Sequence, residues 1–204
     1  MVARRSVLLL LVVALVAGCG EKDEPSATAS RENPLVQQLR DGGLTLVIRH
    51  ATADNEINKQ EKLGDCALQR NLTEAGKEQA KAIAEGVKAL KVPIGDVRSS
   101  PMCRTHDTAE IAFGKVTDDE NLVSPGVTGT EADDKRRAED LKRMVTEAAS
   151  LGTNRVLVTH TGNIGTALGE ETVAEGETLV YDSSARLVGR VKAEDWASLD
   201  EDAD

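Results

Sequence analysis

The sequence has few aromatic residues and no excess of basic charge. Its 204 residues include one Phe, one Tyr and one Trp, and 25 Lys and Arg residues face 35 Asp and Glu residues, for a formal charge of −10. Proteins that bind nucleic acids need a basic surface for the phosphates and often stack aromatic side chains on the bases. The composition therefore argues against a nucleic-acid partner, and the length suits one domain with tails.

Long hydrophobic runs are also missing. The longest, Val7–Ala17, is too short for a bilayer, which a helix of about 20 residues crosses. With Arg4 and Arg5 before it, the run is typical of a signal peptide. Residues 16–19 (VAGC) resemble a bacterial lipobox, which implies cleavage before Cys19 and a diacylglycerol group on its sulfur.

The resemblance to a lipobox implies that residues 1–18 are a lipoprotein signal peptide. The alternatives are an ordinary signal peptide and a twin-arginine signal. We expect an exported protein with a lipid anchor in the cell membrane or outer membrane, facing the periplasm or the exterior. Removing residues 1–18 takes away two arginines and no acid, so the mature chain would carry a charge of −12.

Cysteine is scarce as well. Of three cysteines, Cys19 would carry the lipid, which leaves Cys66 and Cys103 as a pair. An exported protein is in a compartment that permits disulfides, so we expect this pair to be bonded. Two free thiols are the alternative.

Composition divides the remaining chain into three parts. Residues 19–33 are small and polar without apolar periodicity, which predicts a flexible tether. Residues 34–192 contain the periodic segments and form the expected domain. Residues 193–204 contain six acids and no basic residue, which predicts a solvated acidic tail.

Within 34–192, apolar runs typical of buried strands alternate with stripes at helical spacing. This alternation predicts an α/β sandwich with a largely parallel sheet. Strands are expected at 44–48, 96–99, 155–159, 178–181 and 186–191, and helices after Thr73, at 101–113, around 138–148 and at 163–168.

Histidine and arginine follow the expected strands directly. Arg49 and His50 come after the first strand, His160 follows strand 155–159, and Arg104 lies five residues after Ser99. Ligands of open α/β sheets bind beyond the carboxyl ends of the strands, so we expect these side chains to meet in one pocket.

Two arginines and two histidines suit a phosphate group. Arginine binds phosphate oxygens with paired donors. A neutral histidine can attack phosphorus and form a phosphohistidine, and a second, protonated histidine would stabilise charge on the oxygens. This chemistry requires no metal and no cofactor.

Four segments at these positions resemble motifs of the histidine phosphatase superfamily, in the family's order. The Arg-His-Gly motif is similar to residues 49–52 (RHAT), the segment before the first helix to 71–76 (NLTEAG), the second-arginine motif to 99–105 (SSPMCRT), and the late-histidine motif to 158–160 (VTH). The resemblance implies a three-layer α/β/α sandwich with a mostly parallel mixed sheet. It also implies a phosphoric monoester hydrolase.

By the same resemblance, His50 is the nucleophile, Arg49 and Arg104 hold the phosphoryl group, and His160 completes the pocket. Arg70 and Arg98 are further basic residues near the strand ends. The bound molecule would be a phosphorylated small molecule or an envelope phosphosugar; the oligomeric state is open.

The sequence departs from the family at three points. Ala51 and Thr161 replace the glycines expected after the two histidines, and no residue matches the family's general acid. Glu131, Glu175 and Glu177 are candidates for that acid, with Glu177 first because it opens a predicted strand after His160. A leaving group of low pKa would need no acid.

Cys103 adjoins Arg104, so a bond from it to Cys66 would brace the loop of a phosphate-binding arginine. Closing a loop of this length stabilises a fold by about 4 kcal/mol in the chain-entropy model. The pair is also similar to that of exported histidine phosphatases related to lipopolysaccharide heptose phosphatases.

Two other functions stay open at this point. One is a lipid-anchored module that binds phosphate or a phosphosugar with weak or no turnover. The other is a metal site built from His50, His106, His160 and a cysteine, although no close-spaced ligand pair supports it. His106 is otherwise expected on a helix surface.

Overall fold

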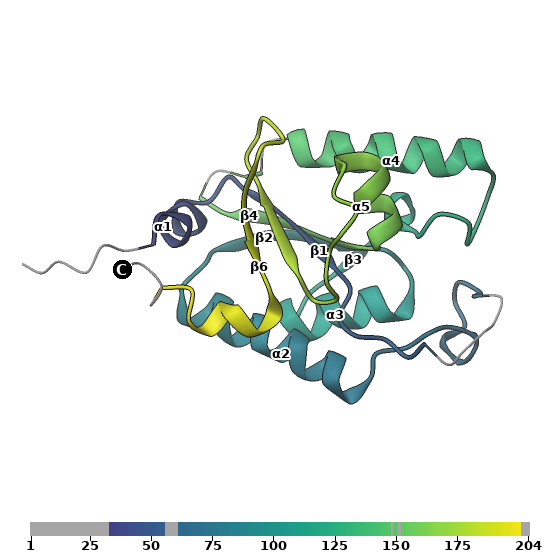
Figure 1. The fold of residues 1–204 in the computed structure, drawn as a ribbon, viewed down its shortest axis with the longest axis horizontal. Helices are drawn as coiled ribbons and strands as arrows, with labels where there is room; N and C mark the ends of the chain where they lie inside the picture. The colour runs from purple at the N-terminus through teal and green to yellow at the C-terminus, as the bar shows by residue number, and fades with distance from the viewer. Residues whose placement is uncertain (1–32, 56–60, 148, 151, 201–204) are drawn as a thin grey trace, which may run out of the picture.

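The computed structural model describes residues 33–55, 61–147, 149–150 and 152–200. The expected signal peptide, Cys19 and the tether up to residue 32 lie outside the described residues. The described part is built around one six-stranded sheet with the strand order β3-β2-β4-β1-β5-β6 (Figure 1).

Five of the six strands of the sheet point the same way, and β5 alone is reversed. The pairs β3–β2, β2–β4 and β4–β1 are parallel, whereas β5 is antiparallel to both β1 and β6. The sheet is therefore mixed and mostly parallel, as expected. The strands are β1 (Thr45–Arg49), β2 (Ile94–Ser99), β3 (Thr117–Asp118), β4 (Asn154–Thr159), β5 (Thr178–Tyr181) and β6 (Leu187–Val191).

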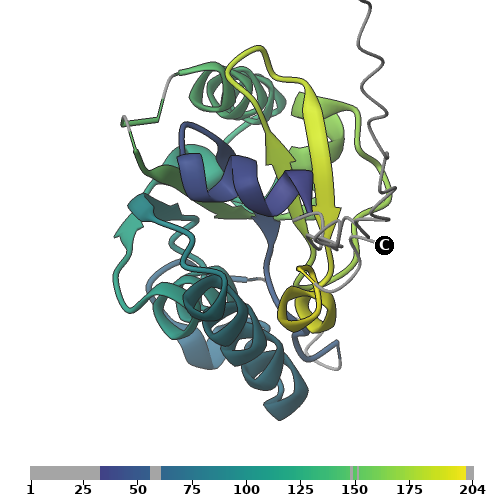
Figure 2. The ribbon, with the colours of Figure 1, turned by 90° about the vertical axis from the view of Figure 1, so that its left-hand side faces the viewer.

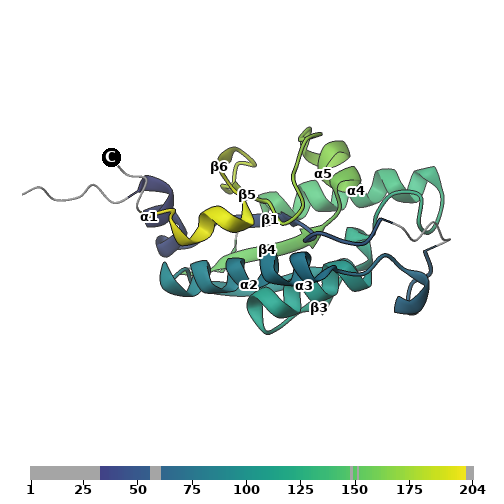
Figure 3. The same ribbon diagram turned by 60° about the horizontal axis from the view of Figure 1, so that its bottom comes forward.

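Helices cover both faces of the sheet, which confirms the three-layer α/β/α fold. α2 and α3 lie on one face, and α4 and α5 on the other (Figure 3). The α-helices are α1 (Pro34–Asp41), α2 (Glu74–Ala89), α3 (Cys103–Phe113), α4 (Glu131–Thr146) and α5 (Thr161–Leu168); 3-10 turns span Cys66–Leu68, Glu120–Leu122 and Ala193–Ala197.

The central strand β1 shows why its sequence is continuously apolar. Leu46 and Ile48 pack into the cluster with α2 and α3, while Val47 packs into the cluster with α4 and α5. All three side chains are fully buried. Because successive residues of a strand face opposite sides, a strand covered on both faces needs apolar residues at every position.

Helix α2 starts where the sequence predicts and approaches the chain beyond β1 closely. The Thr73 hydroxyl accepts a hydrogen bond from the Gly76 N–H at 3.1 Å, as an N-cap does. A Cβ at Gly76 would clash with the carbonyl oxygen of Thr52. Glycine at this position thus lets the helix pack against the segment that follows Arg49 and His50.

The structure adds a helix before β1. α1 begins with Pro34 after the Asn33 cap, and Val36 and Leu39 are fully buried. In Figure 2, α1 lies at the end of the domain nearest the viewer, between α4 and α2. This short helix precedes the amino end of β1, on the opposite side from the strand ends that carry the histidines.

The expectation of a solvated tail from residue 193 is wrong for its first part. Ala193–Ala197 forms a 3-10 turn whose Trp196 is fully buried against α2, where Gly86 leaves room for it. Asn33 also donates a hydrogen bond to the Leu199 carbonyl at 2.8 Å. The segment packs on the domain despite its acids, because burial of the large apolar surface of Trp196 contributes more free energy than solvation of the whole segment would.

Within the described residues, no helix is both long enough and apolar enough to cross a bilayer.

Candidate active site

The carboxyl ends of β1, β4 and β2 lie side by side. Arg49 pairs with Thr159 across β1 and β4, and the His50 N–H donates to the Thr159 carbonyl at 3.0 Å. The His50 and His160 rings are tilted to each other with centroids 5.4 Å apart, and their residues are only 4% and 3% exposed. The two histidines thus meet as the sequence predicts.

The His50 ring is held with one nitrogen bonded and the other available. Nδ1 lies 2.8 Å from the Ala51 carbonyl oxygen, and because a carbonyl only accepts, Nδ1 carries the proton. Burial lowers the pKa of His50 to about 3, although the Ala51 hydrogen bond raises it; Arg104, Arg49 and Arg70 lower it further. His50 is therefore neutral near pH 7, with its Nε2 lone pair free to attack.

His160 is also neutral mainly because it is buried, but its ring nitrogens have other partners. Its Nδ1 lies 3.4 Å from Nη2 of Arg104 and its Nε2 lies 3.0 Å from the Ser100 hydroxyl. A guanidinium only donates, so Nδ1 is unprotonated and Nε2 carries the proton. Burial and then the charge of Arg104 lower the pKa of His160 well below its usual value. His160 is therefore neutral near pH 7 here, and the protonated second histidine expected during phosphoryl transfer stays a prediction.

The two arginines that we expect to bind phosphate each keep an unused donor. Arg104 is 3% exposed and its Nη1 and Nη2 donate to the two carboxylate oxygens of Glu61 at 2.6 and 3.3 Å. Arg49 donates to the Val173 carbonyl at 2.7 Å and to Glu175 at 3.2 Å. Nε of both arginines is buried without a partner among the described residues. Buried donors without partners are costly, and these two lie in the site that contains the two histidines, an arrangement that suits an anion.

Arg70 joins this group and Arg98 does not. Nη2 of Arg70 lies 3.9 Å from the Glu175 carboxylate, and its charge reaches both histidines. Arg98 instead pairs with Asp96 and Asp119. The pocket therefore gathers three arginines, two neutral histidines and two carboxylates.

Glu177, the first candidate for the general acid, is a wrong choice. Its carboxylate accepts from Arg190 at 2.8 Å and from the Ala174 N–H at 2.7 Å. Burial raises the pKa of Glu177, but these hydrogen bonds outweigh it and hold the pKa below its usual value. The side chain is ionised and bound away from the histidines. The sequence correctly predicted that Glu177 directly precedes a strand, β5. It could not predict the direction of the Glu177 side chain.

The other two acid candidates differ in position. Glu131 is exposed at the start of α4. Glu175 contacts Arg49 and Arg70, and the neighbouring Gly176 N–H donates to the carbonyls of Arg49 and His50. Glu175 is thus the one of the three candidates that contacts the pocket, where it is tied to two arginines.

Side chains replace the family's glycines without backbone strain. Neither Ala51 nor Thr161 has a positive φ. Ala51 is buried and its N–H donates to the Thr108 hydroxyl at 3.1 Å, and Thr161 opens α5 with its residue exposed. Both positions accept a Cβ, so these departures leave the pocket intact.

A disulfide joins Cys66 to Cys103, as the even pair predicts, with Cα atoms 5.8 Å apart. Gln69 adds a second connection, since its Oε1 accepts from the Cys103 N–H at 2.9 Å and its Nε2 donates to the Lys62 carbonyl at 2.8 Å. The segment 61–70, which carries Glu61 and Arg70, is therefore fixed to the start of α3 beside Arg104.

Sequence reasoning missed Glu61. It lies 43 residues from Arg104 in an irregular segment, where neither periodicity nor a motif marks it. The disulfide partner Cys66, five residues later, is the one sequence signal that this segment returns to Arg104.

The alternative of a metal site gains no support from the donor set. Both cysteines are bonded to each other, and His106 pairs with Asp118 at 2.9 Å on the surface. In the described part of the chain, no three His, Cys, Asp or Glu side chains gather as metal ligands.

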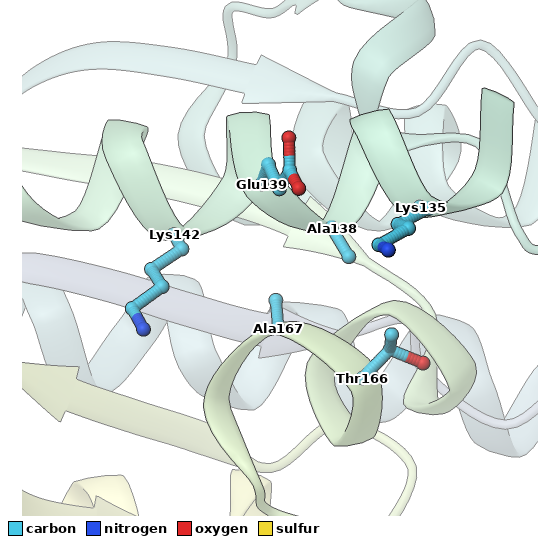
Figure 4. A pocket seen from close by; sticks show the side chains of 6 residues that line it. All are labelled: Lys135, Ala138, Glu139, Lys142, Thr166 and Ala167. Carbon is cyan, nitrogen blue, oxygen red and sulfur yellow. The ribbon is translucent and has the colours of Figure 1, made fainter. Parts of the chain in front are cut away.

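A hollow of about 260 Å³ lies elsewhere, between α4 and α5. Lys135, Ala138, Glu139 and Lys142 of α4 and Thr166 and Ala167 of α5 line it, and Ala138 faces Ala167 (Figure 4). Its lining residues include neither a histidine nor an arginine, so the hollow differs in composition from the site at the strand ends.

One protein family and several solved structures are similar to this chain. The model of the histidine phosphatase superfamily (branch 1) matches residues 45–124, which include Arg49, His50 and Arg104. No curated protein sequence matches the chain.

Several solved structures share the fold. A SixA protein histidine phosphatase complexed with tungstate is 18% identical, with a TM-score of 0.54, over 74% of this chain and 97% of its own. A phosphoserine phosphatase mutant from Entamoeba histolytica with phosphoserine is also 18% identical (TM-score 0.52; 74% and 98%). A phosphoglycerate mutase from Thermus thermophilus is 19% identical (TM-score 0.52; 72% and 98%). Residues 45–124 thus match the histidine phosphatase superfamily, and the domain has the fold of these phosphatase and mutase structures.

Proposed function

We propose that the protein is a metal-independent phosphatase that hydrolyses phosphomonoesters through a phosphohistidine on His50. The observation that carries the proposal is the pair of buried, unpartnered Nε donors of Arg49 and Arg104 beside a neutral histidine. The family match at 45–124 supports it. Structural neighbours bind phosphoserine and 3-phosphoglyceric acid, both phosphomonoesters.

In this mechanism the arginines bind the phosphoryl oxygens and orient phosphorus toward Nε2 of His50. The Ala51 carbonyl keeps the proton on Nδ1, so the ring attacks as a neutral nucleophile and the positive charge that develops is spread toward that carbonyl. The negative phosphate favours protonation of His160, which would then add charge to the pocket during transfer. Water hydrolyses the phosphohistidine and returns His50 to its neutral form.

The pocket has no free carboxyl group to protonate the leaving oxygen. Among the described residues, Glu61, Glu175 and Glu177 are all bound to arginines. Glu175 therefore acts by positioning Arg49 and Arg70. Leaving groups that need little protonation are the expected substrates, and aryl phosphates suit an assay for the same reason.

The test is hydrolysis of p-nitrophenyl phosphate by the purified protein, with and without a chelator. Turnover that survives the chelator and is lost in His50→Asn supports the proposal. Phosphate binding without turnover would favour the binding module, which the tied-up carboxylates make the second candidate. Activity that depends on added metal would contradict the mechanism.

We also propose that the enzyme acts at the cell envelope, anchored by a lipid on Cys19. The lipobox-like segment at residues 16–19 supports this location. Cell fractionation of the wild type and Cys19→Ser tests it: the variant is expected to leave the membrane fraction. Equal membrane association of both proteins would contradict the anchor. A phosphorylated small molecule or an envelope phosphosugar is the proposed class of substrate.

A further inference from the structure

Glu61 binds one edge of the Arg104 guanidinium and leaves its other donors for the pocket. The Glu61 carboxylate accepts from Nη1 at 2.6 Å and from Nη2 at 3.3 Å, so it pairs with the end of the planar group. Nη2 has a second hydrogen, and this nitrogen lies 3.4 Å from Nδ1 of His160. Nε is buried without a partner among the described residues. Glu61 therefore holds Arg104 without using Nε or the second hydrogen of Nη2.

The same guanidinium connects Glu61 to His160. Because Nη2 of Arg104 donates to Nδ1 of His160, the proton of the neutral ring lies on Nε2, which donates to the Ser100 hydroxyl at 3.0 Å. The Ser100 oxygen also accepts from the Met102 N–H at 3.3 Å. A continuous chain of hydrogen bonds thus runs from Glu61 through Arg104 and His160 to the N-cap of α3. A rotation of the guanidinium would remove the bond that sets the His160 tautomer.

Glu61 is itself held at its carboxylate and along its chain. Its Oε1 also accepts from the Arg70 N–H at 3.4 Å. The Cys66–Cys103 disulfide joins the same segment to the residue next to Arg104. A carboxylate with these connections can keep the guanidinium in one orientation.

Burial makes this partner necessary for Arg104. The Arg104 side chain is only 3% exposed, against 16% for Glu61, so water does little to solvate its charge. Burial lowers the pKa of Arg104, and the charge and hydrogen bonds of Glu61 act in the opposite direction. A long side chain with several rotatable bonds also needs fixed partners to present its donors in one geometry.

We propose that Glu61 is a positioning residue, which fixes the guanidinium of Arg104 so that Nε faces the phosphoryl group and Nη2 keeps donating to Nδ1 of His160 in the free enzyme. This inference rests on the proposed function, since the phosphoryl group is the anion that Arg104 would bind. In this role Glu61 contacts neither the substrate nor His50. It acts through Arg104, so its removal should matter only while Arg104 is present.

A double-mutant cycle with p-nitrophenyl phosphate tests this dependence. Glu61→Gln gives Arg104 one oxygen acceptor but places an amide donor against the other Nη group, and is expected to lower kcat/KM by about tenfold. In an Arg104→Lys background the same substitution should change kcat/KM by less than about twofold, because the group that Glu61 positions is gone. Independent effects of the two substitutions would overturn the inference.

The matched control is another Arg–Glu pair of the same length. Glu147 accepts from Nη1 of Arg143 at 2.6 Å at the carboxyl end of α4. Glu147→Gln should leave kcat/KM unchanged. A fall equal to that of Glu61→Gln would assign the loss to a general effect of breaking such a pair, and would contradict a positioning role.

Glu61→Asp separates positioning from charge compensation. It keeps the negative charge beside the buried guanidinium but withdraws the carboxylate by one methylene. We expect a Tm close to that of the wild type and a kcat/KM several-fold lower, because the geometry of Arg104 is no longer fixed. Wild-type kcat/KM in Glu61→Asp would show that charge alone suffices and would overturn the inference.

Nuclear magnetic resonance of the ring nitrogens gives a readout that does not depend on turnover. The chain has three histidines, so the ¹⁵N signals can be assigned one by one. In the free wild type, His160 should show a protonated Nε2 and an unprotonated Nδ1. Glu61→Gln should shift the His160 signals and leave those of His106, which is bonded to Asp118 on the surface, in place.

The two readouts distinguish failure of the inference from failure of the proposed function. Equal kcat/KM in the wild type and Glu61→Gln would overturn the inference, while hydrolysis by the wild type leaves the proposed function standing. If the wild type hydrolyses no ester, the proposed function fails and the ¹⁵N spectra decide whether Glu61 positions Arg104. Unchanged His160 signals in folded Glu61→Gln would then contradict it.

Discussion

His50 and His160 stand at equivalent places, and their neighbours make them chemically different. Each is the first residue after a parallel strand, and each is buried and neutral. His50 donates from Nδ1 to a carbonyl and keeps Nε2 free, whereas His160 accepts at Nδ1 from Arg104 and donates from Nε2 to Ser100. The role of a histidine at a strand end is thus set by the partner of its ring nitrogens.

We expect the largest loss of activity when Nε2 of His50, the proposed nucleophile, is removed. His50→Asn should lower kcat for p-nitrophenyl phosphate on the order of 10³-fold or more, because no nucleophile remains. The same substitution at His106, which is bonded to Asp118 on the surface, should leave kcat unchanged. A His50→Asn protein with near-normal turnover would refute the assignment of the nucleophile.

Arg104→Lys should have the next largest effect. Lysine cannot hold phosphate and Glu61 with separate edges of one planar group, and it removes the donor that sets the tautomer of His160. We expect kcat/KM to fall about 100-fold, as for a lost charge-assisted hydrogen bond of up to about 3 kcal/mol. Arg98→Lys is the control, since Arg98 pairs with acids outside the pocket. A similar fall in both variants would indicate a general structural effect.

The pH dependence tests the neutrality of His50. With a pKa of about 3, the free enzyme should keep its nucleophile down to about pH 4. An ordinary histidine, with a pKa of about 6.5, would lose about 100-fold in kcat/KM by pH 4.5. We expect a loss below tenfold, after correction for ionisation of the substrate. A kcat/KM profile with an enzyme pKa near 6.5 would contradict the buried, neutral state.

The same pKa shift makes the fold sensitive to acid. Between about pH 6.5 and 3 the unfolded chain binds a proton at His50 that the folded chain does not, so the free energy of unfolding falls as pH falls through this range. Urea unfolding at pH 7 and pH 4.5 should show a smaller pH effect in His50→Gln than in the wild type. An equal effect in both proteins would assign the acid sensitivity to other groups.

The smallest effect on catalysis is expected at the disulfide. Cys103→Ser should lower stability by up to about 4 kcal/mol, or several degrees in Tm, while activity falls only a few-fold because Gln69 still connects segment 61–70 to α3. Reductant should lower the Tm of the wild type toward that of the variant. Equal melting temperatures for oxidised wild type and variant would argue against a stabilising bond.

The sequence predicts what depends on local pattern and on strand topology. The apolar runs of β1 and β4 and the Thr73 cap of α2 are local signals, and parallel strands necessarily bring Arg49, His50 and His160 to one edge. It could not predict that Glu177 accepts a hydrogen bond from Arg190, that Glu61 pairs with Arg104, or that Trp196 is buried within an acidic segment. These features depend on side-chain directions and long-range packing, which periodicity does not encode.

The proposed mechanism depends on transfer of the phosphoryl group to Nε2 of His50. The direct measurement is mass spectrometry of protein that is rapidly quenched, without acid, during turnover of p-nitrophenyl phosphate. We expect an acid-labile phosphoryl group on the peptide that contains His50, absent from His50→Asn and present in His106→Asn. A phosphoryl group on His160 instead, or steady turnover with no trapped phosphohistidine in the wild type, would contradict it.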